Sequence, residues 1–100
     1  MKTIMFFHLN GKSLFKTWFK KLDKQISARV AKAIERLENG NFGDCKYLGE
    51  NLVEMRLHFG AGYRIYFTEE DGKIIILLTA GDKKTQDKDI AKAREYIKLI

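Results

Sequence analysis

The sequence contains one cysteine, Cys45, and no proline among its 100 residues. A single cysteine cannot form a disulfide within the chain, which excludes the small secreted scaffolds that several bridges hold together. It also excludes metal sites built from repeated cysteines. A lone thiol suits the reducing cytosol, so we expect a cytoplasmic protein. The absence of proline carries no functional meaning.

Long apolar runs are also missing. The two longest, Ile4–Phe7 and Ile74–Thr79, are far shorter than the ~20 residues that a membrane-spanning helix needs. The first residues lead into a run too brief for the apolar part of a signal peptide, so we expect no targeting segment and no membrane partner. Apolar residues still make up 45% of the chain, which allows a folded core. Because no repeat or linker interrupts it, we expect a single domain over residues 1–100.

The charge of the chain is basic and unevenly distributed. Nineteen Lys and Arg residues against 13 Asp and Glu give a formal charge of +6. Residues 1–50 carry a net charge of +5, and residues 51–100 carry a net charge of +1. A basic balance favours a polyanionic partner but does not identify one. In the second half of the chain, any binding of an anionic partner would therefore depend on the position of each cation more than on the net charge.

The spacing of apolar residues predicts three helices. Apolar side chains at positions 14, 15, 18, 19 and 22 follow helical spacing, and a second stripe over positions 26–37 follows the capping residue Asp23. Asn39-Gly40-Asn41 favours an end to the second helix, since Gly and Asn tolerate left-handed backbone. The turn between these helices is very short, so we expect an antiparallel helical hairpin. The third helix has Ile90, Ala93, Ile97 and Ile100 on one stripe.

Alternation with a period of two predicts strands in the rest of the chain. A short strand is predicted at Ile4–Phe7, and the period changes to two again after Gly43. Asp71-Gly72 is typical of a hairpin turn, and the run that follows is apolar on both faces, as in a central strand. The resulting order, β-α-α-β-β-β-β-α, predicts an α+β fold with a mainly antiparallel sheet.

Polar side chains gather on the face of the predicted sheet that points away from the helical hairpin. Alternate residues of one strand lie about 6.6 Å apart and form a row, and a tight turn brings the next strand beside it. Two lysines leave the central strand close to the same region. The set comprises Glu54, Arg56, His58, Arg64, Tyr66, Lys83 and Lys84.

This set suits phosphodiester chemistry. The planar guanidinium of arginine holds a phosphate and stabilises the charge that develops in its transition state. A carboxylate or an imidazole can take the proton of an attacking hydroxyl, and RNA supplies that hydroxyl itself, so we expect no metal and no cofactor. The residue pattern also fits a solvated pair of Glu54 with Arg56 and a surface histidine at His58. The residues by themselves leave both interpretations open.

Four motifs follow one another along the chain and together resemble one protein family. With the Trp18–Leu22 helix they resemble the addiction-module killer proteins, a HigB-like branch of the RelE/ParE toxin superfamily, over nearly the whole chain. The motifs are Asn39-Gly40-Asn41-Phe42-Gly43-Asp44-x-Lys46-x-Leu48-Gly49, Glu54-Met55-Arg56-Leu57, Gly60-x-Gly62-Tyr63-Arg64-Ile65-Tyr66-Phe67 and Gly81-Asp82-Lys83-x-Thr85-Gln86-x-x-Asp89-Ile90-x-x-Ala93.

The resemblance implies a toxin of a type II toxin–antitoxin pair with a RelE-like fold, similar to the microbial RNases. It implies a ribosome-dependent endoribonuclease without a metal, in which the 2′-OH of mRNA attacks the adjacent phosphate. The implied partners are the ribosome, mRNA and a helix-turn-helix antitoxin that represses the operon. Operator DNA is then reached only through the antitoxin.

Residue by residue, the resemblance implies the catalytic groups. Arg64 matches the arginine that contacts the scissile phosphate in RelE-like toxins, and Lys84 falls where the family has a second basic residue. Arg56 aligns with a basic strand residue, and Glu54 with a position that is basic in some members and a glutamate base in others. Further contacts with RNA are expected from Lys83, His58, Tyr66 and Lys46.

One position departs from the family pattern. Several ribosome-dependent members carry Tyr or His as an acid or base near the start of the last helix, where this sequence has Ile90. That substitution leaves Glu54 and His58 as the candidate bases. ParE-like members share the fold and poison DNA gyrase without cleaving RNA, so gyrase inhibition is the alternative function.

Overall fold

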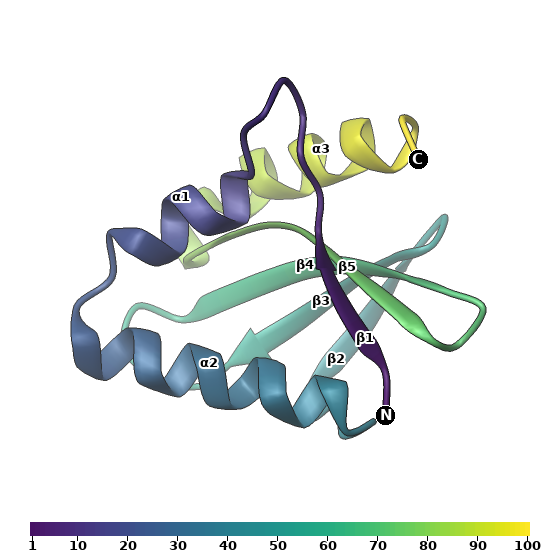
Figure 1. Ribbon diagram of the computed structural model, residues 1–100. Coiled ribbons are helices and arrows are strands. Elements are labelled where there is room, and N and C mark those ends of the chain that lie inside the picture. Colours follow the sequence, from purple (N-terminus) through teal and green to yellow (C-terminus); the bar gives the residue numbers. More distant parts are fainter.

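A computed structural model describes all 100 residues and shows an α+β fold, with a five-stranded sheet and three α-helices (Figure 1). The radius of gyration is 12.4 Å, as expected for a compact chain of this length. None of the helices has the length and apolar character needed to cross a membrane. The elements are β1 (Thr3–Phe6), α1 (Leu14–Lys20), α2 (Lys24–Glu38), β2 (Cys45–Gly49), β3 (Leu52–Leu57), β4 (Tyr63–Glu70), β5 (Ile74–Gly81), the 3-10 turn η1 (Lys83–Thr85) and α3 (Gln86–Ile97).

The sheet is mixed, with the strand order β1-β5-β4-β3-β2. Strand β1 runs parallel to β5, while the other three pairings are antiparallel. Asp71 and Gly72 both adopt positive φ, at 53° and 65°, which lets the chain reverse between β4 and β5. Strand β5 lies inside the sheet and buries apolar side chains on both of its faces, as its continuous apolar run predicted.

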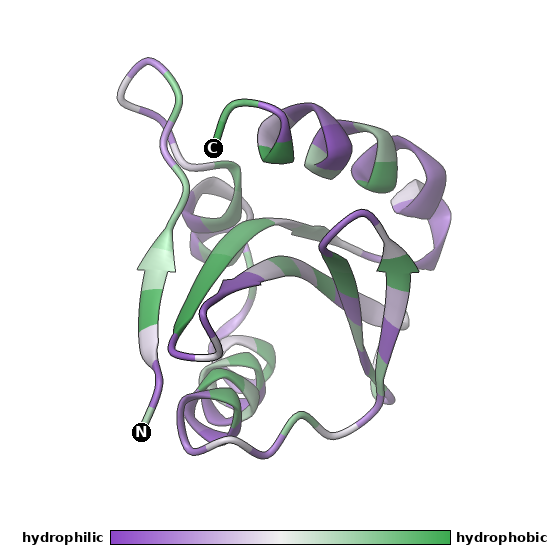
Figure 2. Cartoon of the chain, turned by 90° about the vertical axis from the view of Figure 1, so that its right-hand side faces the viewer, coloured by the Kyte–Doolittle hydropathy of each residue, from purple (hydrophilic) through white to green (hydrophobic).

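Helices cover both faces of this sheet (Figures 1 and 2). On one face, α2 and the aromatic residues of α1 enclose the larger core, which includes Phe15, Val30 and Leu37 with Met55 and Leu57 of β3. On the opposite face α3 encloses a smaller core. Its buried members are Leu52, Tyr66, Leu78, Ala93 and Tyr96.

The antiparallel hairpin predicted for the first two helices does not describe the structure. Helix α1 has only seven residues and diverges from α2 (Figure 1). Its aromatic side chains, among them Phe15 and Trp18, pack into the larger core under the sheet, and α1 makes its main contacts with β5. A helix of two turns offers too little surface to lie along the 15 residues of α2, so burial against the sheet decides its position.

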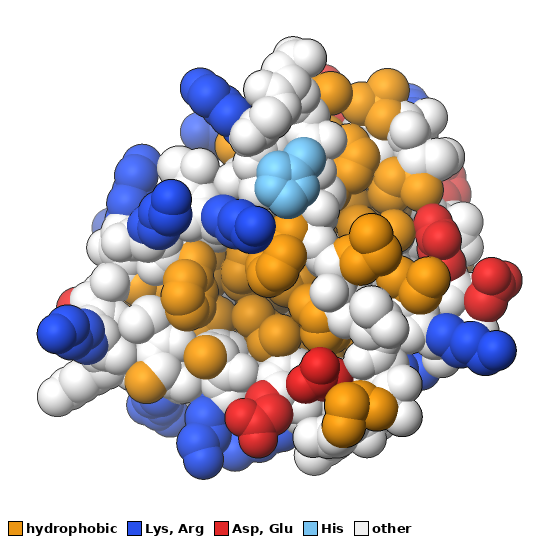
Figure 3. Space-filling model, viewed as in Figure 1, with side chains coloured by type: hydrophobic (Ala, Val, Ile, Leu, Met, Phe, Trp, Pro, Cys, Tyr) orange, Lys and Arg blue, Asp and Glu red, His pale blue; other side chains and the backbone are white.

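The outer surface over α1 and α2 combines Lys and Arg side chains with an apolar centre (Figure 3). A small pocket of about 330 Å³ lies there between β1 and the two helices. Its lining is mostly apolar, with Phe6, Phe15, Phe19 and Ile34 beside Lys16 and Lys20. Part of the positive charge of the first half of the chain therefore lies around an apolar surface.

The sheet face predicted to be open is covered in part by α3. The alternation in β3 is as predicted, because Met55 and Leu57 face α2 while Leu52 and Glu54 face the other way. The first turn of α3 packs over that second face, and Glu54 and Tyr66 are completely buried there. The polar row thus divides into a buried part under α3 and an accessible part beyond the end of the helix.

Candidate active site

Glu54 forms the centre of the polar cluster. Its side chain is almost completely buried and accepts hydrogen bonds from three elements of the fold. Arg56 Nε donates to Oε1 over 3.1 Å, while Tyr66 Oη and Gln86 Nε2 donate to Oε2 over 3.1 and 2.9 Å. Both carboxylate oxygens are therefore occupied by donors of the chain itself.

The surroundings of Glu54 keep it ionised. Burial by itself raises the pKa of this carboxyl group. Hydrogen bonds from Gln86, Arg56 and Tyr66, together with the charge of Arg56, outweigh burial and hold the pKa below its ordinary value. A buried carboxylate with a lowered pKa and no free oxygen is poorly suited to take a proton from a substrate, so the predicted role of general base does not fit its position.

Two arginines lie next to this carboxylate on neighbouring strands. Arg56 of β3 and Arg64 of β4 are directly opposite in the sheet register, an arrangement in which like charges repel. Glu54 compensates for one of the two charges, because its oxygens lie 3.1 Å from Arg56 Nε and 3.7 Å from Arg64 Nε. The three side chains together retain one positive charge.

The guanidinium of Arg64 has unused hydrogen-bond donors. Its side chain is 14% exposed, and Nη1 donates to the carbonyl oxygen of Gly62 over 3.1 Å. Nε is buried and faces Glu54 without forming a hydrogen bond, while Nη2 makes no hydrogen bond within the chain. A guanidinium held in place by one backbone carbonyl, with further donors available, is well suited to bind an oxyanion such as phosphate.

A pocket of about 340 Å³ opens beside the two arginines. Its walls come from the end of β3, the turn that follows and the start of β4. The lining residues are Arg56, Leu57, His58, Phe59, Gly60, Gly62, Tyr63 and Arg64. Both arginines and the imidazole of His58 are thus available to the same bound group.

His58 forms a pair with Asp44, which the sequence interpretation did not include. His58 Nε2 lies 2.6 Å from Asp44 Oδ2, and both side chains are well exposed. Because the carboxylate can only accept, Nε2 carries the proton of this hydrogen bond. In the neutral ring Nδ1 is then left as the acceptor, which is the form that a general base requires.

The two lysines after β5 are placed by a rigid turn. The Asp82 side chain accepts hydrogen bonds from the backbone of Lys84 and Thr85, while the Thr85 hydroxyl donates to Asp89 over 2.6 Å. A Cβ on Gly81 would overlap the Asp89 carboxylate and the Thr85 hydroxyl, so a larger residue here would displace this hydrogen-bonded pair. Burial raises the pKa of Asp89, whereas the bond from Thr85 and the charge of Lys88 lower it less strongly.

Lys83 lies closer to the pocket than Lys84 does. The backbone N–H of Lys83 donates to Ala61 O over 3.4 Å, in the turn that borders Arg64. Lys84 is exposed on the same turn, and its ammonium group makes no hydrogen bond within the chain. The backbone and Cβ of Lys83 therefore lie next to the turn at Gly62, and both lysine side chains are exposed on η1.

Three other positions named from the sequence lie around this centre. Lys46 is exposed on β2, directly across from Glu54 in the register. Tyr66 is completely buried and donates to Glu54; burial and the Glu54 charge raise the pKa of its hydroxyl. A buried phenol is out of reach of RNA, so the contact predicted for Tyr66 does not fit its position. Ile90 packs against the smaller core under α3.

Two residues of the site had no role in the sequence interpretation. Gln86 at the start of α3 donates to Glu54, 32 positions away in the sequence, and Asp44 pairs with His58 over a separation of 14 positions. Both residues lie within the quoted motifs, but no periodicity relates them to their partners. Only the fold brings these partners together.

The thiol of Cys45 is held in its protonated form. Cys45 Sγ donates to Phe42 O over 2.8 Å. Burial, followed by the charge of Asp44, raises the pKa of the thiol to about 11, so it stays protonated at neutral pH. No three His, Cys, Asp or Glu side chains lie close enough together to hold a metal ion between them.

Comparison with known proteins places the chain in a family. Residues 17–98 match the model of the family described as "Phage derived protein Gp49-like (DUF891)". A relative in Haemophilus influenzae, described as an uncharacterized protein, is 43% identical over 81 residues, covering 80% of this chain and 82% of the relative. The chain belongs to the Gp49-like family, a toxin-like family of the RelE/HigB type that is associated with toxin–antitoxin pairs.

Proposed function

We propose that this protein is the HigB-like toxin of a toxin–antitoxin pair and that it cleaves mRNA on the ribosome without a metal ion. The observation that carries the proposal is the arginine pair on β3 and β4. The buried charge of Glu54 holds Arg56 and Arg64 side by side, and the terminal nitrogens of Arg64 make only one hydrogen bond within the chain, which leaves donors for a phosphate. Family membership supports the toxin assignment.

In the proposed reaction Arg56 and Arg64 hold the scissile phosphate and stabilise the charge of its transition state. His58 Nδ1 takes the proton from the adjacent 2′-OH, and Asp44 keeps the imidazole oriented. The 2′-oxygen forms a bond to phosphorus while the bond from phosphorus to the 5′-oxygen breaks. The departing 5′-oxygen takes a proton from water, leaving a 2′,3′-cyclic phosphate and a 5′-hydroxyl end.

The lysines contribute charge in this proposal rather than proton transfer. Lys83 and Lys84 on η1 and Lys46 on β2 are exposed around the site, where they attract the RNA backbone. For the partner that the family implies, we propose a helix-turn-helix antitoxin that contacts operator DNA itself, so that the toxin reaches DNA only through it.

The test of this function is a brief induction of the protein in a bacterial host, followed by mapping of transcript ends. We expect growth to stop, new ends with 5′-hydroxyl groups to lie within translated codons, and co-expression of the cognate antitoxin to prevent both effects. Intact transcripts with broken chromosomal DNA would instead indicate gyrase as the target. Normal growth after induction would contradict both toxin functions.

Replacing His58 with alanine is expected to lower the rate of cleavage about 100-fold, because general base catalysis is typically worth 10²–10⁴. The side chain is 72% exposed, so the variant should keep the melting temperature of the wild type. Cleavage is measured on purified ribosome complexes across a range of pH. Asp44→Asn serves as the companion variant, with a smaller loss, since the imidazole remains. Cleavage by His58→Ala at the wild-type rate would show that another group is the base.

A further inference from the structure

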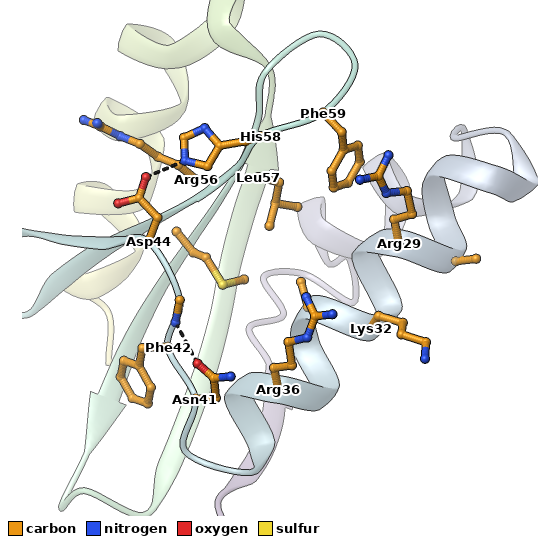
Figure 4. Close-up of a pocket in the computed structure, with 14 residues that line it drawn as sticks. Arg29, Lys32, Arg36, Asn41, Phe42, Asp44, Arg56, Leu57, His58 and Phe59 are labelled. Atoms are coloured by element: carbon orange, nitrogen blue, oxygen red, sulfur yellow. Dashed lines mark hydrogen bonds and ion pairs between the residues drawn. The ribbon is translucent and has the colours of Figure 1, made fainter.

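A second and larger pocket, of about 530 Å³, lies between α2 and the edge of the sheet (Figure 4). It adjoins the pocket beside the arginines, because the end of β3 lines both. The shared residues are Arg56, Leu57, His58 and Phe59. A chain bound at the arginines can therefore pass around the end of β3 into this groove, which we call the α2 groove.

The α2 groove has an apolar floor and a basic rim. Met55 and Leu57 of β3 form the floor, and Phe42 closes the end near β2. Arg29, Lys32 and Arg36 line its α2 side. Their spacing of three and four residues puts them on one face of the helix, over a length of about 10 Å.

The α2 groove contains little negative charge. Asp44 is the one acidic residue among the 14 that line it, and His58 occupies its carboxylate. The three α2 cations make no salt bridge within the chain. Three unpaired cations above an apolar floor favour a ligand that is both anionic and flat.

One contact gives the groove the surface that a nucleobase requires. The guanidinium carbon of Arg29 lies 4.0 Å from the centre of the Phe59 ring, so the cation lies over the face of the ring. Phe59 is half-buried at the junction of the two pockets. Proteins bind single-stranded RNA by combining aromatic and arginine stacking surfaces with a basic groove that follows the phosphates.

We propose that the α2 groove binds single-stranded RNA next to the scissile phosphate, with one base on the Arg29–Phe59 stack and the backbone along the three cations of α2. This inference rests on the proposed function, because the groove starts at the pocket that holds Arg56 and Arg64. An acidic peptide could also pair with the cations, but it would leave the flat stacking surface and the continuity with the arginines unused.

The experiment measures binding of a fluorescent single-stranded oligonucleotide in which every 2′-OH is methylated, so that it cannot be cleaved. We expect the triple variant Arg29→Ala, Lys32→Ala, Arg36→Ala to bind at least tenfold more weakly, with a smaller dependence of affinity on salt. The matched control, Lys73→Ala, Lys92→Ala, Lys98→Ala, removes the same charge from other parts of the surface. It should bind within twofold of the wild type.

The single variant Phe59→Leu separates stacking from charge. It keeps an apolar side chain and the net charge, and it should weaken binding about fivefold or more with an unchanged salt dependence. Equal affinities of the groove and control triple variants would overturn the inference. So would a groove variant that still binds RNA fully but no longer binds an acidic segment of the antitoxin.

The outcome for the groove is independent of the outcome for cleavage. If binding of the methylated RNA requires the three cations of the α2 groove while induced cells show no cut transcripts, the proposed cleavage is wrong and the groove inference is supported. If transcripts are cut in an Arg64-dependent way and the groove variant binds and cuts like the wild type, the groove inference fails alone.

Discussion

Replacing Arg64 with alanine is expected to abolish growth arrest and to lower the rate of mRNA cleavage by about 10²–10³. In the proposed reaction the loss affects the chemical step, because the variant lacks the guanidinium that would stabilise the phosphate in its transition state. Cleavage is measured by single-turnover kinetics on purified ribosome complexes. Growth after induction provides the measurement in cells.

The structure indicates that this variant still folds. Arg64 makes one hydrogen bond within the chain, to the carbonyl oxygen of Gly62. Glu54 keeps its three donors, Arg56, Tyr66 and Gln86, when the Arg64 side chain is removed. We therefore expect the melting temperature to fall by only a few degrees, so that loss of activity and loss of folding remain separable.

Arg64→Lys is the matched control for charge. Lysine keeps the positive charge but loses the planar fork that binds two phosphate oxygens together, so cleavage should fall between that of the wild type and that of Arg64→Ala. Equal cleavage rates for Arg64→Lys and the wild type would show that Arg64 contributes only its positive charge and not the geometry of its guanidinium. Growth arrest and cleavage by folded Arg64→Ala at the wild-type rate would remove Arg64 from the mechanism.

The local features of the fold follow from the sequence because they depend on neighbouring residues. Asp23 caps α2 as predicted, with its carboxylate accepting from Ile26 N over 3.0 Å. The alternation in β3 correctly assigns Met55 and Glu54 to opposite faces. Such patterns predict which face of a helix or strand a residue occupies. They do not predict which other element packs against that face. The position of α1 and the cover that α3 provides are therefore visible only in the structure.

The same limit applies to the site. The sequence predicts that Glu54, Arg56 and Arg64 share a face, and the structure brings these residues into contact. Nothing in the local sequence marks Glu54 as buried, because its donors Tyr66 and Gln86 come from positions 12 and 32 residues away. Burial changes the function that the carboxylate can have. A group expected to exchange protons with RNA becomes one that positions two arginines.

Replacing Glu54 with glutamine tests this positioning role and is expected to destabilise the fold by about 3 kcal/mol, the cost of removing one partner from a buried ion pair. The amide has nearly the same shape but no charge, so Arg56 and Arg64 would face each other without compensation. For a chain of 100 residues this loss corresponds to a fall in melting temperature of roughly 10–20 °C.

The pH dependence of stability identifies the carboxylate as the source of this effect. Because the pKa of Glu54 is lower in the folded state than its ordinary value of 4.5, its ionisation stabilises the fold above that pH. The contribution is lost as the pH falls through the lowered pKa. The difference in unfolding free energy between the wild type and Glu54→Gln should thus be largest near neutral pH and shrink below pH 4.5. A difference that stays constant down to pH 3 would show that the charge of Glu54 is not what stabilises the cluster.

Kinetics of the same variant, below its melting temperature, distinguish positioning from proton transfer. If Glu54 only holds the arginines, Glu54→Gln should cleave more slowly at every pH while the profile keeps its shape, since His58 remains as the base. If Glu54 were the base, the acidic limb of the profile would change or disappear in the variant. The three donors on its two oxygens and its complete burial favour the first outcome. A buried carboxylate then acts on RNA only through the arginines that it keeps in place.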